Sequence, residues 1–153
     1  MTDRSTFSDD EWKALAEAPL QITIAIVAAG PHRPMTIVKE AAASAREIAK
    51  PEAHGAADAL IAEIAKDARG HEARHDVESR RPGETPDDIV ERALTGLGQA
   101  MAALAKIGTD EASGVRTWYS DIAKVVADAS KTVAPAEQQV LDRIAALLQA
   151  PAG

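Results

Sequence analysis

Apolar residues recur every three or four positions along most of the chain, which is the spacing of one face of an α-helix. Five segments repeat this spacing over several turns. Their apolar positions are Ile37, Val38, Ala41, Ala45 and Ile48; Ala57, Leu60, Ile61, Ile64 and Ala68; Ile89, Ala93, Leu97, Met101 and Leu104; Val115, Trp118, Ile122, Val125 and Ala129; and Val140, Leu141, Ile144, Leu147 and Leu148. The pattern predicts amphipathic helices that bury these positions against one another.

A further helix precedes these five, and its start carries a complete set of signals. Ser8 and Glu11 have the spacing of a capping box, and Phe7 and Trp12 flank them as in a hydrophobic staple. Pro19 lacks the backbone N–H that a helix interior needs. We therefore expect Pro19 to interrupt this first helix.

The stretch after Pro19, from Leu20 to Ala29, admits two interpretations. Its isoleucines alternate with other residues, and a period of two is typical of a strand. A lone strand would leave its backbone hydrogen bonds unpaired, and the sequence offers no second strand to pair with it. We therefore expect a buried helix over residues 20–29.

Proline, glycine and capping residues set the remaining boundaries. The expected helices run over about 35–49, 51–70, 85–108, 109–129 and 135–149, with a polar loop over 71–81. Thr85, followed by Pro86, is an expected N-cap, and so is Thr109, followed by two acids. Gly96 and Gly98 weaken their helix unless another backbone packs closely there. The loops are short, so we predict an all-α, single-domain bundle of about six or seven helices over residues 1–153, frayed at 1–7 and 151–153.

Composition agrees with a helical bundle and excludes several other classes of protein. Alanine makes up about a fifth of the 153 residues, which favours helices. The chain has no cysteine, which rules out a disulfide scaffold and thiolate metal sites. Its net charge of −7 comes without an evident basic face, and only 3% of residues are aromatic, so we expect no nucleic-acid partner.

Neither a secretory signal nor a membrane span is evident in the sequence. The first ten residues are polar and lack an apolar core region. The longest apolar run, from Leu20 to Ala29, is too short to cross a bilayer. We therefore expect a cytoplasmic protein.

One motif suggests metal chemistry. The segment His71-Glu72-Ala73-Arg74-His75 has the pattern H-E-x-x-H, in which two histidines one helical turn apart hold Zn²⁺ and the glutamate acts as general base. A third ligand would have to be a carboxylate, because no histidine follows His75. The candidates are Asp76, Glu78, Glu84 and Glu91.

The surroundings of this motif favour an exposed charged turn instead. Gly70 stands immediately before it, and Arg74 places a positive charge beside the metal position. The flanking residues are densely charged, and no strand is available to hold an extended substrate.

Other clusters are interpreted structurally. Trp118 is expected to anchor the core, with Tyr119 beside it as a half-exposed ring. Glu137 and Asp142 are expected on a solvated helix face, and Asp110 and Glu111 complement the dipole at a helix start.

Two stretches share a helix–turn–helix rhythm. An apolar helix, Ile122 to Ala129, has Asp128 near its end, and Val133-Ala134-Pro135-Ala136-Glu137 opens the next helix. The stretch Ile24 to Gly30, followed by Ile37-Val38-Lys39-Glu40, repeats the rhythm. In these features the chain resembles the TerB-like tellurite-resistance domains, which are all-helical bundles with an internal duplication. In that family the acidic turns are associated with divalent cations, and the matching residues here are Asp128 and Glu137.

Two hypotheses of function follow. The first, implied by the resemblance, is a non-enzymatic helical interaction domain of a bacterial stress-response system, linked to a divalent cation and without a cofactor. Its partner is expected to be another protein, and association into a homo-oligomer stays open. The alternative is a small zinc-dependent hydrolase in which His71, His75 and Glu91 hold Zn²⁺ and Glu72 is the general base.

Overall fold

Every regular element that the computed structural model describes is a helix, which confirms the all-α prediction. The described residues are 2–30, 42–48, 55–70, 82–129 and 133–149. Their elements are η1 (Arg4–Thr6), α1 (Asp9–Ala29), η2 (Gly55–Ala57), α3 (Asp58–Ala68), α5 (Pro86–Leu104), α6 (Thr109–Asp128) and α7 (Pro135–Gln149), with residues 42–48 also helical. The predicted loop over 71–81, the end 151–153 and the predicted helix start at Pro51 lie outside the described residues.

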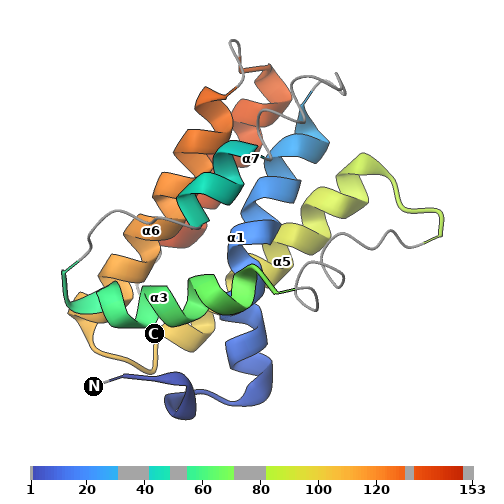
Figure 1. Cartoon of the computed structure of the whole chain (residues 1–153). Coiled ribbons are helices and arrows are strands. Elements are labelled where there is room, and N and C mark those ends of the chain that lie inside the picture. Colours follow the sequence, from blue (N-terminus) through green and yellow to red (C-terminus); the bar gives the residue numbers. More distant parts are fainter. Residues whose placement is uncertain (1, 31–41, 49–54, 71–81, 130–132, 150–153) are drawn as a thin grey trace.

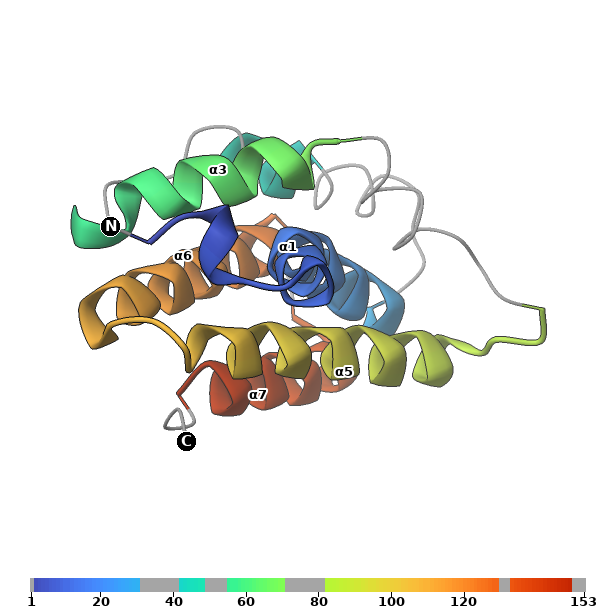
Figure 2. The ribbon, with the colours of Figure 1, turned by 90° about the horizontal axis from the view of Figure 1, so that it is seen from below.

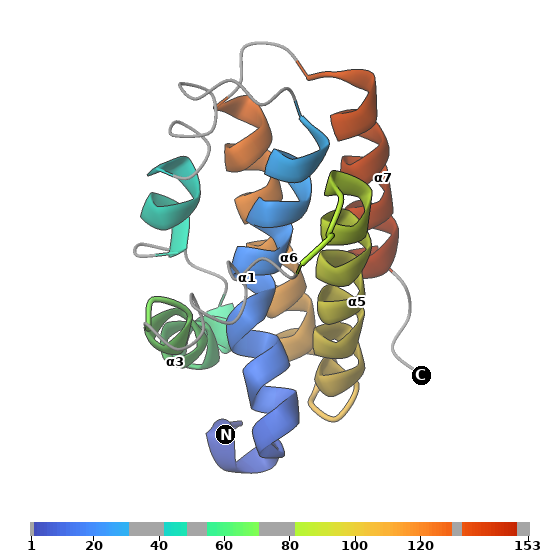
Figure 3. The ribbon, with the colours of Figure 1, turned by 90° about the vertical axis from the view of Figure 1, so that its right-hand side faces the viewer.

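The first long helix lies at the centre of the bundle. α5, α6 and α7 pack around α1 with their axes roughly aligned with it, and α3 runs across the other side (Figure 3). Seen from below, α1 lies between α3 on one side and α5 and α7 on the other (Figure 2). α5 and α7 lie side by side and run in the same direction, whereas α6, which connects them, runs back between the two ends of the bundle (Figures 1 and 3).

The start of α1 is as the sequence predicts. The Ser8 hydroxyl accepts a hydrogen bond from the Glu11 N–H at 3.2 Å, and the Glu11 carboxylate accepts one from the Ser8 N–H at 3.3 Å. The Phe7 and Trp12 rings are buried, with centroids 5.9 Å apart. The indole N–H of Trp12 donates to Asp67 on α3 at 2.6 Å, so the same turn ties α1 to α3.

The predicted interruption at Pro19 is wrong, because α1 is continuous through it to Ala29. A proline at this position cannot donate to the carbonyl of Leu15, four residues earlier. The hydroxyl of Tyr119, on α6, donates to that carbonyl instead, at 2.8 Å. A tertiary contact thus satisfies the backbone oxygen that the proline leaves without its helical partner. The predicted helix over 20–29 is confirmed.

Tyr119 is therefore not the half-exposed ring that the sequence predicts. Its exposed fraction is 0%, as is that of Trp118, and the two rings lie 5.5 Å apart. Burial raises the pKa of the Tyr119 hydroxyl well above its ordinary value, which keeps the hydroxyl protonated as a hydrogen-bond donor.

The sequence predicted no membrane span, because its longest uninterrupted apolar run, from Leu20 to Ala29, is too short. By length and composition alone, however, the whole of α1 is long and apolar enough to cross a membrane. The most apolar 18-residue stretch of α1 has a mean hydropathy of 1.2, and 61% of that stretch is buried inside the bundle. Burial against other helices on this scale is typical of a core helix.

Two other predicted details need correction. Thr109 does not cap its helix: α6 begins at Thr109 itself, and Gly108 takes the N-cap position without a side-chain hydrogen bond. In residues 42–48 the buried positions are Ser44 and Ile48, while Ala45 is exposed. Ser44 faces inward because its hydroxyl lies 2.6 Å from that of Thr23 on α1. By contrast, the predicted Thr85 cap of α5 is confirmed, with a reciprocal hydrogen bond to Asp88.

The two glycines inside α5 have different surroundings. A side chain at Gly96 would begin 2.8 Å from the amide nitrogen of Gln21, which is buried on α1. The missing side chain therefore leaves room for Gln21 of α1, so a side chain, and not the backbone expected from the sequence, packs against Gly96. A side chain at Gly98 would meet nothing within 4 Å. Gly98 leaves open space on the outer side of α5.

Candidate functional site

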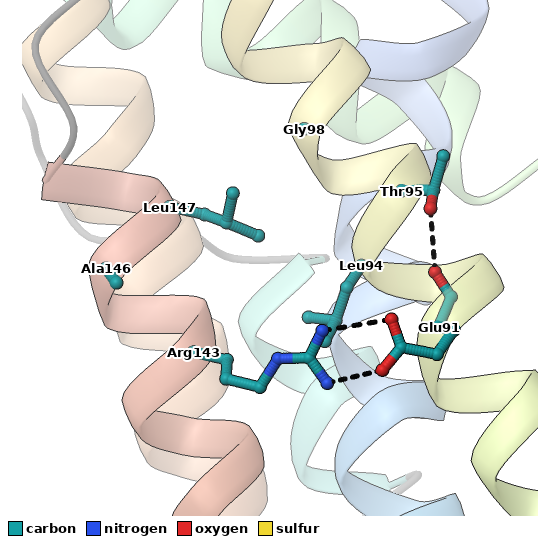
Figure 4. A pocket seen from close by; sticks show the side chains of 7 residues that line it. All are labelled: Glu91, Leu94, Thr95, Gly98, Arg143, Ala146 and Leu147. Atoms are coloured by element: carbon teal, nitrogen blue, oxygen red, sulfur yellow. Dashed lines mark hydrogen bonds and ion pairs between the residues drawn. The ribbon is translucent and has the colours of Figure 1, made fainter.

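The open space at Gly98 belongs to a groove between α5 and α7. The groove has a volume of about 520 Å³ and is drawn in Figure 4. From α5 it is lined by Glu91, Leu94, Thr95 and Gly98, and from α7 by Arg143, Ala146 and Leu147. Arg143 reaches across the groove at one end, and Leu147 points from α7 toward α5 nearer the other end (Figure 4).

Residue size and helix direction together create the groove. α5 and α7 run in parallel, so Glu91 and Arg143 lie at one level, Thr95 and Leu147 lie near the next, and Gly98 lies beyond Leu147 (Figure 4). Leu94 is buried and forms part of the groove floor, whereas Leu147 is half-buried. Because position 98 has no side chain and position 146 has only a methyl group, the neighbouring side chains do not fill the groove between the two helices.

Apart from Glu91 and Arg143 at one end, the groove lies in an uncharged surface. α5 carries no charged residue from Ala93 to Ala105, and α7 carries none from Ile144 to Gln149. Several of these uncharged residues are exposed: Thr95, Ala145, Ala146 and Gln149, together with Gln99 and Ala102 on the side of α5 that faces α1. Exposed faces of helices in soluble proteins normally carry charged side chains. The depletion of charged residues on this face is one property of the core of a protein–protein interface.

An ion pair closes the charged end of the groove. The Arg143 guanidinium donates to both carboxylate oxygens of Glu91, at 2.6 and 3.0 Å. This hydrogen bonding lowers the pKa of the Glu91 carboxyl and raises the pKa of Arg143. Both side chains stay accessible, with exposed fractions of 62% and 49%, so each can exchange its partner for another charge.

Glu137, which the sequence placed on a solvated helix face and also as a cation ligand, is buried. Its exposed fraction is 0%. One carboxylate oxygen accepts a hydrogen bond from the Ala134 N–H at 3.3 Å, in the first turn of α7. The carboxyl carbon lies 2.9 Å from where a side chain at Gly30 would begin, so Glu137 packs against the end of α1. The prediction of a solvated face is therefore wrong for Glu137, whereas Asp142 is exposed.

Asp128, the second candidate ligand of a divalent cation, is exposed at the end of α6. In the part of the chain that the structure describes, no three His, Asp or Glu side chains come close enough together to hold a metal ion. The other oxygen of Glu137 is shielded from solvent and has no hydrogen-bond partner there. The described residues thus supply one buried carboxylate and one exposed carboxylate, and not a ligand cluster.

The zinc motif lies outside the described residues, since His71, Glu72 and His75 belong to the range 71–81. Two of its candidate third ligands, Asp76 and Glu78, lie in the same range. The other two carboxylates are described, and each binds an arginine: Glu91 binds Arg143, and Glu84 binds Arg92 through two contacts of 2.8 Å.

A second hollow, between α1 and α5, has a different character. It is larger, at about 640 Å³, and charged side chains line it: Asp10, Glu11, Lys13, Glu17 and Lys106. Lys106 donates to Glu11 there at 2.6 Å. Because charged side chains are costly to cover, the α5–α7 groove is the better candidate for a binding site.

Sequence reasoning missed the groove residues Thr95, Arg143 and Ala146. The signal was present as the charge-free run from Ala93 to Ala105, which is unusual for a helix with an exposed face. The sequence could not reveal that α7 lies beside α5 at the same level, because that pairing arises only in the tertiary structure. Comparisons with protein-family models, with curated proteins and with solved structures find no significant match to this chain.

Proposed function

We propose that this chain is a non-enzymatic helical interaction domain that binds a protein partner through the groove between α5 and α7. The observation that carries the proposal is the exposed, charge-free surface around Gly98. Covering the surface around Gly98 removes apolar area from water, and the nearest charged side chains, Glu91 and Arg143, lie only at one end of it. The two charged side chains at the groove end, Glu91 and Arg143, would set the register of the partner.

The proposed setting rests on the resemblance alone. TerB-like domains suggest a bacterial stress-response system, and they suggest a link to divalent cations through Asp128 and Glu137. The α5–α7 groove does not depend on either suggestion, because its lining residues come from other positions.

A crosslinking experiment tests the proposed interface. A photoreactive benzophenone residue is placed at Thr95, which lines the groove, and in a second variant at Thr117 on α6. The two threonines are matched: both are exposed, and each hydroxyl donates to the carbonyl four residues earlier, at 2.8 and 2.9 Å. Irradiation in cells that express the chain should give a discrete protein adduct from position 95 and none from position 117. Absence of any adduct at 95, or an equal adduct at 117, would contradict the proposal.

A further inference from the structure

The two walls of the groove, α5 and α7, complement each other in shape and in charge, and this restricts what can bind in the groove. On α5, Gly98 leaves a space into which a side chain fits. On α7, the exposed methyl group of Ala146 and the half-buried Leu147 provide apolar groups that lie nearer the ion pair than Gly98 does (Figure 4). At the end of the groove, Glu91 on α5 is negative and Arg143 on α7 is positive, and these two side chains lie at one level.

We propose that the groove binds a second copy of this chain, with a two-fold axis that runs along the helices. This inference rests on the proposed interaction surface and names its partner. Such an axis places α5 of one copy over α7 of the other in parallel, with levels matched. The stretch of α5 from Thr95 to Gly98 then faces the edge of α7 that carries the partner's Leu147, and the reciprocal contact forms on the other side. A symmetric interface of this kind needs one surface that complements itself.

Charge selects this arrangement over the other two-fold arrangement. With the axis along the helices, Glu91 faces Arg143 of the partner subunit and both ion pairs form between the copies. A two-fold axis that crosses the helices at the level of Glu91 would instead bring Glu91 against Glu91 of the partner subunit, which is repulsive. Because both side chains are more than 40% exposed in one copy, they can exchange partners without unfolding any element.

The rest of the surface allows the two copies to approach closely. No charged residue of α5 from 93 to 105, or of α7 from 144 to 149, would be buried on association. Small residues at exposed positions let helix backbones come near one another, as in helix pairs that pack through ridges and grooves. The interface combines an apolar centre with charges at its rim, as stable protein–protein interfaces do.

The first test is the oligomeric state of the full chain by sedimentation equilibrium, at concentrations from about 1 µM to about 1 mM. The chain should form a dimer whose dissociation constant rises at least about tenfold in Gly98→Gln, because the new side chain fills the groove. Position 98 is open in one copy, so at a concentration that keeps both proteins monomeric Gly98→Gln should melt no lower than the unchanged chain, which separates loss of dimer from misfolding. Thr117→Gln on α6 is the matched control and should leave the dissociation constant unchanged.

The second test exchanges the charges. Glu91→Arg alone and Arg143→Glu alone should each weaken the dimer, since like charges then face each other. An equimolar mixture of the two variants should form mixed dimers in which opposite charges meet again. A chain that stays monomeric over the whole range, or a dimer that Gly98→Gln does not weaken, would overturn the second-copy proposal.

The outcomes separate this inference from the proposed function. A crosslinked adduct from Thr95 with the mass of two chains supports both. An adduct with a different protein, together with a monomeric chain in solution, overturns the second copy but leaves the groove as an interaction surface. No adduct from Thr95 together with a monomeric chain overturns both.

Discussion

Tyr119 gives the carbonyl of Leu15 the hydrogen bond that the missing N–H of Pro19 cannot give it. The contact joins residues 104 positions apart and is fully buried. A buried carbonyl without a partner is costly, which explains how a proline stays inside a continuous core helix. The proline, the carbonyl and the phenol form one unit, and the unit can be tested by exchanging its parts.

Tyr119→Phe should lower the free energy of unfolding by about 1–3 kcal/mol, because it leaves the Leu15 carbonyl buried without a donor. In a Pro19→Ala background the alanine N–H restores the helical bond, so the same change should cost clearly less. Urea denaturation of the four variants gives the coupling as a double-mutant cycle. Equal costs of Tyr119→Phe in both backgrounds would show that the hydroxyl and the proline are independent.

The two glycines of α5 form a second residue-scale test. Gly98→Ala should raise the free energy of unfolding by about 0.5–1 kcal/mol, since alanine favours the helix and its methyl group meets open space. Gly96→Ala gains the same helix propensity but pushes against the buried Gln21 amide. It should therefore be less stable than Gly98→Ala when both are compared by thermal or urea unfolding. The reverse order would mean that α1 and α5 are not in close contact at Gly96.

At the scale of elements, hydrogen-bonded acids hold the helix starts. The Asp88 carboxylate accepts a hydrogen bond from the Thr85 N–H at 3.0 Å, and this bond lowers the pKa of Asp88. The Glu11 carboxylate accepts from Lys106 and from the Ser8 N–H, and these bonds lower the pKa of Glu11. A carboxyl whose pKa is lower in the folded state stabilises that state above its ordinary pKa. The contribution is lost as the pH falls through the lowered value.

Stability should therefore decrease as the pH falls below about 4.5, the upper end of the ordinary carboxyl range. Asp88→Asn keeps an acceptor but has no charge to titrate. Its stability deficit should be present near neutral pH and shrink toward about pH 3, as followed by urea unfolding at each pH. Asp87→Asn is the control, because the Asp87 side chain accepts no hydrogen bond from a described residue. A deficit of Asp88→Asn that is constant with pH would contradict the capping role.

The same elements indicate how far the sequence predicts this fold. Ser8 with Glu11, and Thr85 with Pro86, are local signals, and both helix starts are where these residues place them. The break expected at Pro19 did not occur, because the compensating donor, Tyr119, lies on another helix. Local spacing cannot reveal that a distant hydroxyl replaces a backbone N–H.

The candidate site was less predictable than the helices. Glu137 has the polarity and position of a surface residue, and its burial depends on where the end of α1 packs. The groove depends on α5 and α7 being parallel neighbours, a relation between segments that are separated by the whole of α6. Helical spacing predicted each apolar stripe, but the exposed, charge-free face was defined only by what the folded neighbours leave uncovered.

At the scale of the whole molecule, the core is apolar and continuous. It joins α1 to α3, α5, α6 and α7 through fully buried side chains such as Leu15, Ile64, Leu97 and Ile144. Hydrophobic burial of this kind stabilises a domain of this size without a bound ion.

Treating the protein with a chelator should accordingly leave its melting temperature nearly unchanged. The hypothesis of a cation at Asp128 and Glu137, and the zinc alternative at His71 and His75, both make the opposite prediction, since a bound ion stabilises the folded state. Thermal unfolding with and without chelator, followed by addition of Ca²⁺ or Zn²⁺, distinguishes the cases. A fall of about ten degrees on chelation would show that a metal contributes to the folded state.

α1 lies at the centre of the bundle, and it is synthesised before most of the helices that cover it. α1 ends at residue 29, and α7, which packs beside it, begins about 100 residues later, so at typical rates of synthesis roughly 5–20 s separate them. Until residue 86 is made, this apolar helix of 21 residues has none of α5, α6 and α7 to pack against, and the set is complete only when α7 has been made. We expect chains stalled before α5 to be far more sensitive to protease within α1 than released chains, and to bind holdase chaperones there. Equal resistance of stalled and released chains would contradict this. We therefore expect the growing chain to need protection of α1 until α7 has been made.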